Sequence, residues 1–232
     1  IPGRLESTFG GGELNVAISA AIQGYRSAFL TALPDSVLTD ALEQECRKLG
    51  VETDLLHRSE RGRFGLYCLE TGANQRAGTV TYDREGSTVS LYPADDYHWE
   101  RAFDGANWFH ITGITPAISA CAADAAMAAV KKAKDCGVTV SCDLNFRKKL
   151  WKWKAGTSAV DLARETMRRL MPYIDVVIAN EEDADLSLGI QASDSNVDAG
   201  ELNIAAYRQV AETVVSQYPN VRQVAITLRE SI

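Results

Sequence analysis

Three polar residues at alternating positions, Asp143, Asn145 and Arg147, follow a predicted buried strand. In an extended chain, residues two apart point to the same side, so we expect these side chains to face one cleft. Asp and Asn can bind hydroxyl groups, and Arg can bind a carboxylate or a phosphate through two parallel hydrogen bonds. Solvation of an ordinary loop is an equally good interpretation of the same residues.

A run of three glycines at residues 10–12 stands directly before a predicted helix, and Asn15 follows in the first turn of that helix. Adjacent glycines let the backbone approach a ligand closely, and the free N–H groups of a helix start can bind its polar atoms. The run matches neither the G-x-G-x-x-G pattern nor a Walker A loop, because the Lys-Ser/Thr pair is missing. Ligand binding and a flexible turn both remain open.

Two further groups could contribute to a site. Tyr67, Tyr82 and Arg84 lie on neighbouring predicted strands, where they could cover a sugar-sized ligand or form ordinary cross-strand contacts. Asn180 and Asp183 follow another buried strand. Asparagine and acidic residues are favoured at a helix N-terminus, and the same carboxylates could serve a hydrated Mg²⁺. We predict a helix cap at residues 180–183, with a metal contact as an additional role.

The elements that position these residues alternate between strands and helices. Apolar periodicity predicts helices at 15–22, 38–49, 119–136, 158–171 and 203–217, and strands at 27–33, 108–111, 138–142, 175–179 and 221–227. Repeated units of this length predict a mostly parallel sheet with helices on both faces, and ligands bind such sheets beyond the carboxyl ends of the strands. A patch without helices, with strands at 64–70, 79–83 and 87–92, predicts a small antiparallel sheet.

Composition and net charge disfavour several functional classes for this protein. The 232 residues carry a formal net charge of −7, which disfavours a nucleic-acid or anionic-membrane partner. The basic and aromatic run at 148–154 is therefore better explained as an amphipathic segment with tryptophans packed inward. Five cysteines without C-x-x-C spacing argue against disulfides and structural zinc, and no apolar run reaches the roughly 18 residues of a membrane span. We expect a cytoplasmic protein.

These elements together resemble the ribokinase-like (PfkB-type) carbohydrate kinases over nearly the whole chain. The resemblance rests on five segments: FGGGELNVA at 9–17, GLY at 65–67, YDR at 82–84, SCDLNFRKKLW at 141–151 and ANEEDA at 179–184. The Gly-Gly and Asn pattern occurs throughout that family. The stretch at 143–151 is more specific and resembles the 2-keto-3-deoxygluconate kinases.

The resemblance implies a three-layer α/β domain with a β lid within residues 62–92, and ATP-dependent phosphorylation of 2-keto-3-deoxygluconate to its 6-phosphate. It implies ATP as the phosphate donor and Mg²⁺ as its companion. It also implies roles for individual residues: sugar contacts by Gly11, Gly12, Asn15 and Asn145; closure over the sugar by Tyr67, Tyr82 and Arg84; a contact with the sugar acid or the transferring phosphate by Arg147; a position near Mg²⁺ for Asn180 and Asp183; and the start of the nucleotide pocket at Thr227.

The sequence also departs from the family pattern. The family's first strand should precede Ile1, and the Gly-Ala-Gly-Asp turn that holds the catalytic base is absent. We therefore expect residues 1–232 to form an incomplete domain, with the base beyond Ile232. Three alternatives remain: a kinase of a neutral sugar such as fructose or ribose, which Arg84 and Arg147 disfavour; a non-catalytic sugar-acid sensor; and a generic nucleotide-binding protein, which the missing dinucleotide loop disfavours.

We also expect a homodimer or a higher homo-oligomer that forms through the lid. A sheet of two or three strands is marginally stable alone and exposes an unpaired edge. Pairing two lids across a two-fold axis would solve both problems.

Overall fold

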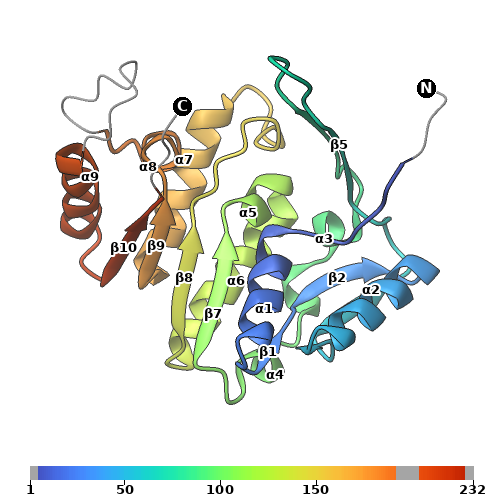
Figure 1. The fold of residues 1–232 in the computed structure, drawn as a ribbon. Helices are drawn as coiled ribbons and strands as arrows, with labels where there is room; N and C mark the ends of the chain where they lie inside the picture. The colour runs from blue at the N-terminus through green and yellow to red at the C-terminus, as the bar shows by residue number, and fades with distance from the viewer. Residues whose placement is uncertain (1–4, 192–203, 228–232) are drawn as a thin grey trace.

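The computed structural model describes residues 5–191 and 204–227. Its largest sheet has four strands in the order β10–β9–β8–β7, which are Gln223–Ile226, Val176–Ala179, Thr139–Asp143 and Trp108–Thr112. All three neighbouring pairs are parallel, as predicted. The four carboxyl ends therefore lie at one edge of the sheet (Figure 1).

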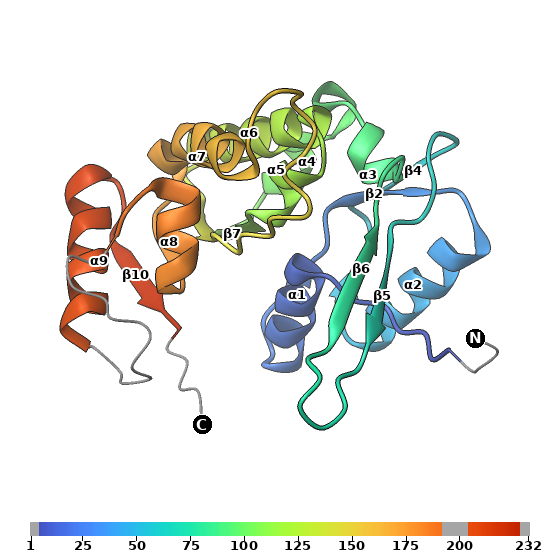
Figure 2. The same ribbon diagram turned by 90° about the horizontal axis from the view of Figure 1, so that it is seen from above.

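The sheet is covered by the predicted helices α6 (Ala120–Asp135) and α7 (Ala159–Leu170), which lie on the same side of it (Figure 2). Val140 of β8 and Leu162 and Met167 of α7 are fully buried in the core between them. The described residues from Ala94 onward also form the helices α4 (Trp99–Phe103), α5 (Ile114–Ile118), α8 (Glu181–Leu188) and α9 (Ile204–Gln217), with 3₁₀ turns at Ala94–Asp96 and Met171–Tyr173. Trp151 is 2% exposed, so the prediction of inward-packed tryptophans is confirmed for this residue.

The prediction of one strand at 27–33 is wrong, because the segment forms two short strands. β1 (Ser27–Ala28) pairs with β3 (Val51–Glu52), and β2 (Thr31–Pro34) pairs with β4 (Leu56–Ser59), both in parallel. The register shifts by one residue between the two pairs. The cause is a turn between β3 and β4, in which the Leu56 N–H donates to the Thr53 carbonyl. An extra residue in one strand interrupts a ladder in this way.

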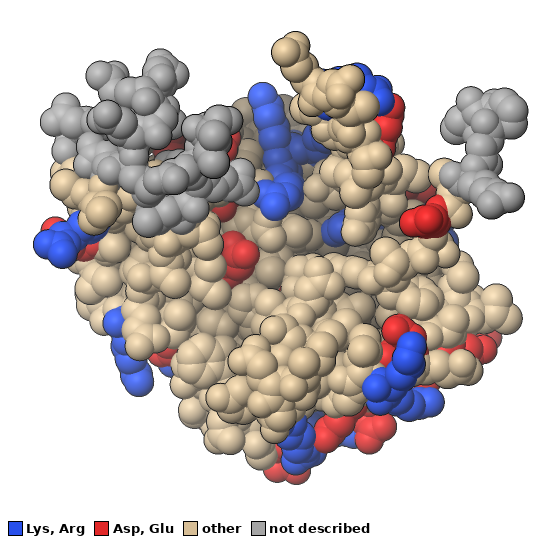
Figure 3. Space-filling model, in the orientation of Figure 1, with Lys and Arg blue, Asp and Glu red and all other residues tan. Residues whose placement is uncertain are grey.

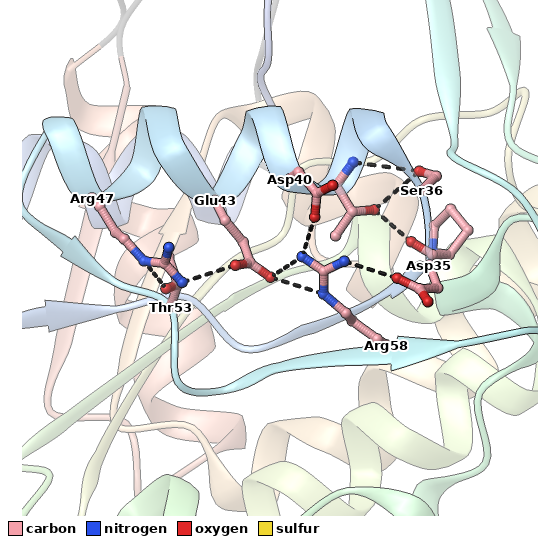
Figure 4. Close-up of polar contacts among 9 residues, drawn as sticks. Asp35, Ser36, Asp40, Glu43, Arg47, Thr53 and Arg58 are labelled. Carbon is pink, nitrogen blue, oxygen red and sulfur yellow. Dashed lines mark hydrogen bonds and ion pairs between the residues drawn. The ribbon is translucent and has the colours of Figure 1, made fainter.

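A network of ion pairs attaches β4 to helix α2 (Val37–Lys48) (Figure 4). The Arg58 guanidinium donates to carboxylates of Asp35, Asp40 and Glu43 at 2.7–3.1 Å. Glu43 also accepts from Arg47 at 2.8 Å. One arginine thus joins the strand to the N-terminal half of the helix, which itself begins at the predicted Pro-Asp-Ser turn.

The predicted lid is present as a separate antiparallel sheet of two strands, β5 (Leu66–Glu70) and β6 (Thr79–Asp83). It projects from the rest of the molecule at one end of the fold (Figure 1). The third predicted lid strand, at 87–92, is wrong. This segment contains the short helix α3 (Thr88–Leu91), whose Ser90 carbonyl accepts a hydrogen bond from the Ser119 hydroxyl at 2.7 Å. Contacts with α6 therefore override its β-branched composition.

All five cysteines are free thiols. Within residues 5–191 and 204–227, no helix combines the length and the apolarity that crossing a membrane requires.

Candidate active site

The glycine run forms the N-terminal turn of α1 (Gly12–Ile22). Gly11 precedes the helix with φ 151°, and its carbonyl accepts from the backbone N–H of Asn15 at 2.9 Å. A Cβ atom placed on Gly10 would lie 3.5 Å from the Tyr67 hydroxyl oxygen and 4.0 Å from Asn15 Oδ1. The structure therefore brings the glycine turn, Asn15 and the lid residue Tyr67 together.

The same turn contacts the carboxyl ends of β7 and β8. A Cβ atom on Gly12 would lie 3.1 Å from Thr112 Cγ2 and 3.9 Å from Asn145 Nδ2. Two groups that the sequence analysis treated separately, the glycine run and the polar residues after β8, consequently line one site. Thr112, at the end of β7, was missed, because nothing in the sequence links it to a helix so far away in the chain.

The prediction that residues 143–147 are extended is wrong. Asn145 has φ 35°, in the left-handed region that asparagine tolerates better than most residues. Asp143 Oδ1 accepts from the backbone N–H of Asn145 at 3.1 Å and closes a turn. The turn, and not the alternation of a strand, decides where these side chains point.

Burial raises the pKa of Asp143 to about 6, and the negative charges of Asp183 and Glu13 act in the same direction. The Asn145 N–H and the positive charge of Arg147 oppose that increase in the pKa. Arg147 is half-buried, and its Nη1 donates to the Phe146 carbonyl at 2.9 Å. The last residue of β8 and the loop that follows it thus hold a carboxyl group and a guanidinium close to each other.

The raised pKa makes a prediction about stability. Because its folded-state pKa exceeds the ordinary value, the Asp143 carboxyl group binds more protons in the folded protein than in the unfolded chain between about pH 4 and 6. The contribution of Asp143 to the free energy of unfolding should therefore decrease as the pH rises through this window. Asp143→Asn keeps an oxygen acceptor for the Asn145 N–H and should remove the decrease. Calorimetry should show the Tm of the variant rising relative to that of the wild type from pH 4 to 7, and a difference independent of pH would contradict the prediction.

Residues 180–183 form the predicted helix cap, which is confirmed as a capping box at the start of α8. Asn180 Oδ1 accepts from the Asp183 N–H at 2.7 Å, and Asp183 Oδ2 accepts from the Asn180 N–H at 3.4 Å. Asp183 Oδ1 accepts from the Phe146 N–H at 2.9 Å, so the cap also holds the loop after β8. Asp183 is only 8% exposed.

The described residues do not fit a directly ligated metal ion. Both carboxylate oxygens of Asp183 accept from backbone N–H groups. In the part of the chain that the structure describes, no three His, Cys, Asp or Glu residues are grouped as metal ligands.

Tyr67 and Tyr82 lie on the two lid strands, and Arg84 directly follows β6. Tyr67 and Tyr82 are paired across the two strands, with ring centroids 6.4 Å apart. The Arg84 guanidinium lies 5.3 Å from the centre of the Tyr82 ring. Lys149 Nζ donates to the Val80 carbonyl at 3.0 Å, which joins the lid to the loop after β8. Basic side chains are visible beside the lid on this face of the molecule (Figure 3).

Thr227 follows β10, and its N–H donates to the Ala179 carbonyl at 2.9 Å. It is exposed at the same sheet edge as Asn180, on the β9–β10 side. The candidate sugar residues lie around β7 and β8, and the candidate nucleotide residues lie around β9 and β10.

A model of the family described as "pfkB family carbohydrate kinase" matches residues 1–228. The 2-dehydro-3-deoxygalactonokinase of Haloferax volcanii is 35% identical over 77% of this chain and 54% of that protein. Fructokinase-2 of Solanum habrochaites is 27% identical over 81% of this chain and 54% of that protein. The chain thus spans about half the length of these curated relatives.

The crystal structure of a 2-dehydro-3-deoxygluconokinase from Thermotoga maritima is 43% identical and superposes with a TM-score of 0.86. The superposition covers 97% of this chain and 64% of that one. It confirms the predicted layered, mostly parallel α/β fold with a small antiparallel sheet.

Proposed function

The chain belongs to the pfkB family of carbohydrate kinases, and from this premise we propose that it phosphorylates a small sugar acid with ATP. The proposed substrate is 2-keto-3-deoxygluconate, also called 2-dehydro-3-deoxygluconate, and the proposed product is its 6-phosphate. The names of the similar proteins from Thermotoga maritima and Haloferax volcanii support a keto-deoxy sugar acid.

One observation carries the proposal within this chain: the glycine turn, the lid and the loop after β8 converge. Tyr67 of the lid and Asn15 both lie next to Gly10, and Asn145 lies next to Gly12. Side-chain amides and a phenol suit the several hydroxyl groups of a sugar. Arg147, in the same loop as Asn145, offers the charge that a carboxylate requires.

In the proposed reaction, the sugar binds between Gly11, Gly12, Asn15 and Asn145, and Tyr67, Tyr82 and Arg84 close over it. Closure excludes water and so limits wasteful hydrolysis of ATP. Arg147 holds the sugar carboxylate or the transferring phosphoryl group, and stabilises the charge on it. ATP binds at the β9–β10 side, beside Asn180 and Thr227. The base that deprotonates the sugar hydroxyl is proposed to lie C-terminal to Ile232.

A coupled assay of ADP release by the full-length protein tests the proposal. ATP should be consumed in the presence of 2-keto-3-deoxygluconate. The galactonate epimer of this sugar acid serves as a comparison substrate, and fructose serves as a neutral one. A preference for fructose would favour the neutral-sugar alternative, for which the Solanum habrochaites relative is the supporting observation. Binding of the sugar acid without any turnover would support the sensor instead.

We further propose that the protein forms a homodimer through its lid. We also propose that it works in a reducing cytoplasm, and its five free thiols agree with that location. The lid exposes apolar side chains: Leu66 is 49% exposed and Leu69 62%. The two side chains point to opposite faces of the two-stranded sheet, and burial of exposed apolar side chains of this kind against a second copy is favourable. Light scattering at micromolar concentration should give a dimer for the wild type and a monomer for Leu66→Asp. A monomeric wild type would contradict the proposal.

A further inference from the structure

Glu13 is the second residue of α1, where an acidic side chain has an ordinary explanation in the positive end of the helix dipole. Its carboxylate nevertheless bonds to a different part of the chain. Glu13 Oε1 accepts from the Thr112 N–H at 3.1 Å, from the Thr112 hydroxyl at 2.8 Å and from the Thr115 hydroxyl at 2.7 Å. One carboxylate oxygen thus collects three donors from the end of β7 and the start of α5.

These bonds act at the point where the glycine turn meets the sheet. Thr112 is 2% exposed, and its methyl group lies close to the backbone of the neighbouring Gly12. Hydrogen bonds to an ionised acceptor are shorter and stronger than neutral ones. The turn is therefore held against β7 by close packing at Gly12 and by a charged acceptor at Glu13.

We infer that Glu13 is a positioning residue for the sugar site. Its carboxylate ties the first turn of α1 to the carboxyl end of β7, and so fixes the position of Asn15, which lies beside Gly10 as Tyr67 of the lid does. The effect that we expect on sugar binding rests on the proposed function. Without the tether, the turn can shift, and the contacts of the sugar with Asn15 weaken. The candidate nucleotide residues Asn180 and Thr227 directly follow β9 and β10, outside the tethered elements.

The test compares Glu13→Ala, Glu13→Gln and Thr115→Val in the full-length protein. Glu13→Ala should raise the KM for the sugar acid about tenfold or more and leave the KM for ATP unchanged, since small displacements of positioning groups have effects of this order. Glu13→Gln keeps an oxygen acceptor and should recover much of the loss. Thr115→Val removes one donor of three and should have a smaller effect, which disappears in the Glu13→Ala background.

Glu43→Ala is the matched control, because Glu43 has a 14% exposed side chain bonded to Arg47 and Arg58, away from the glycine turn. It should lower the Tm and leave both KM values unchanged. Sugar KM values equal to the wild type in both Glu13 variants and in Thr115→Val would overturn the inference.

Hydrogen exchange separates this inference from the proposed function, because it needs no substrate. Glu13→Ala should speed amide exchange at residues 10–15 and 112–115, or Glu13→Gln should do so if the alanine variant does not fold. A wild type that phosphorylates no sugar acid would refute the proposed function, while faster exchange would still support the tether. Unchanged exchange in these segments would overturn the tether whatever the substrate.

Discussion

Arg147→Ala should lower kcat/KM for 2-keto-3-deoxygluconate by about 30-fold or more. Truncating one partner of a desolvated, hydrogen-bonded charge pair costs about 2 to 5 kcal/mol, and about 1.4 kcal/mol corresponds to a factor of ten. Arg147 is suited to such a contact because it is half-buried beside Asp143 and has one nitrogen held by the Phe146 carbonyl. Steady-state kinetics with the full-length protein measure the effect.

Arg147→Lys should recover only part of the loss, because an ammonium group cannot make two parallel bonds to a carboxylate. Both variants should be assayed against the sugar acid and a neutral ketose. If Arg147 binds the sugar carboxylate, the loss appears with the acid alone. If it binds the transferring phosphate, the loss appears with both substrates and mainly in kcat. An unchanged ratio between the two substrates would remove Arg147 as the acid-selecting residue.

Gly113→Ala should lower the free energy of unfolding by about 3 kcal/mol, at the upper end of the usual cost of overpacking. Gly113 lies directly after β7, with an ordinary helical φ of −63°. A Cβ atom there would overlap the Leu144 carbonyl oxygen, which is backbone and cannot swing away. The Gly113 N–H donates to the Asp143 carbonyl at 2.8 Å, so relief of the overlap also breaks this bond. Urea unfolding measures the loss.

Gly137→Ala is the matched control, since the two glycines are required for opposite reasons. Gly137 has φ 72°, and a Cβ atom there would meet nothing within 4 Å. Its replacement should therefore cost only about 1 kcal/mol, from the left-handed backbone alone. Equal losses for the two variants would show that the close approach of β7 and β8 is not what requires a glycine at 113.

The sequence by itself determined the features that depend on neighbouring residues. Ser158 caps α7 through the Asp161 N–H, and residues 180–183 form their capping box within four residues. The order of strands and helices follows from local apolar periodicity in the same way. Tyr67 and Tyr82 could be expected to pair because their strands adjoin in the chain.

Only the tertiary structure decided the features that depend on which strands become neighbours. The split of residues 27–33 follows from the register of β3 and β4, and the helix at Thr88–Leu91 follows from its packing against α6. The Phe146–Asp183 bond joins segments that are far apart in the sequence. The bond of Glu13 to Thr112 spans 99 residues. The residue type of a hydrogen-bond donor does not indicate which acceptor it will meet at that distance in the sequence. The partner is decided by the order of the parallel strands, and packing sets that order.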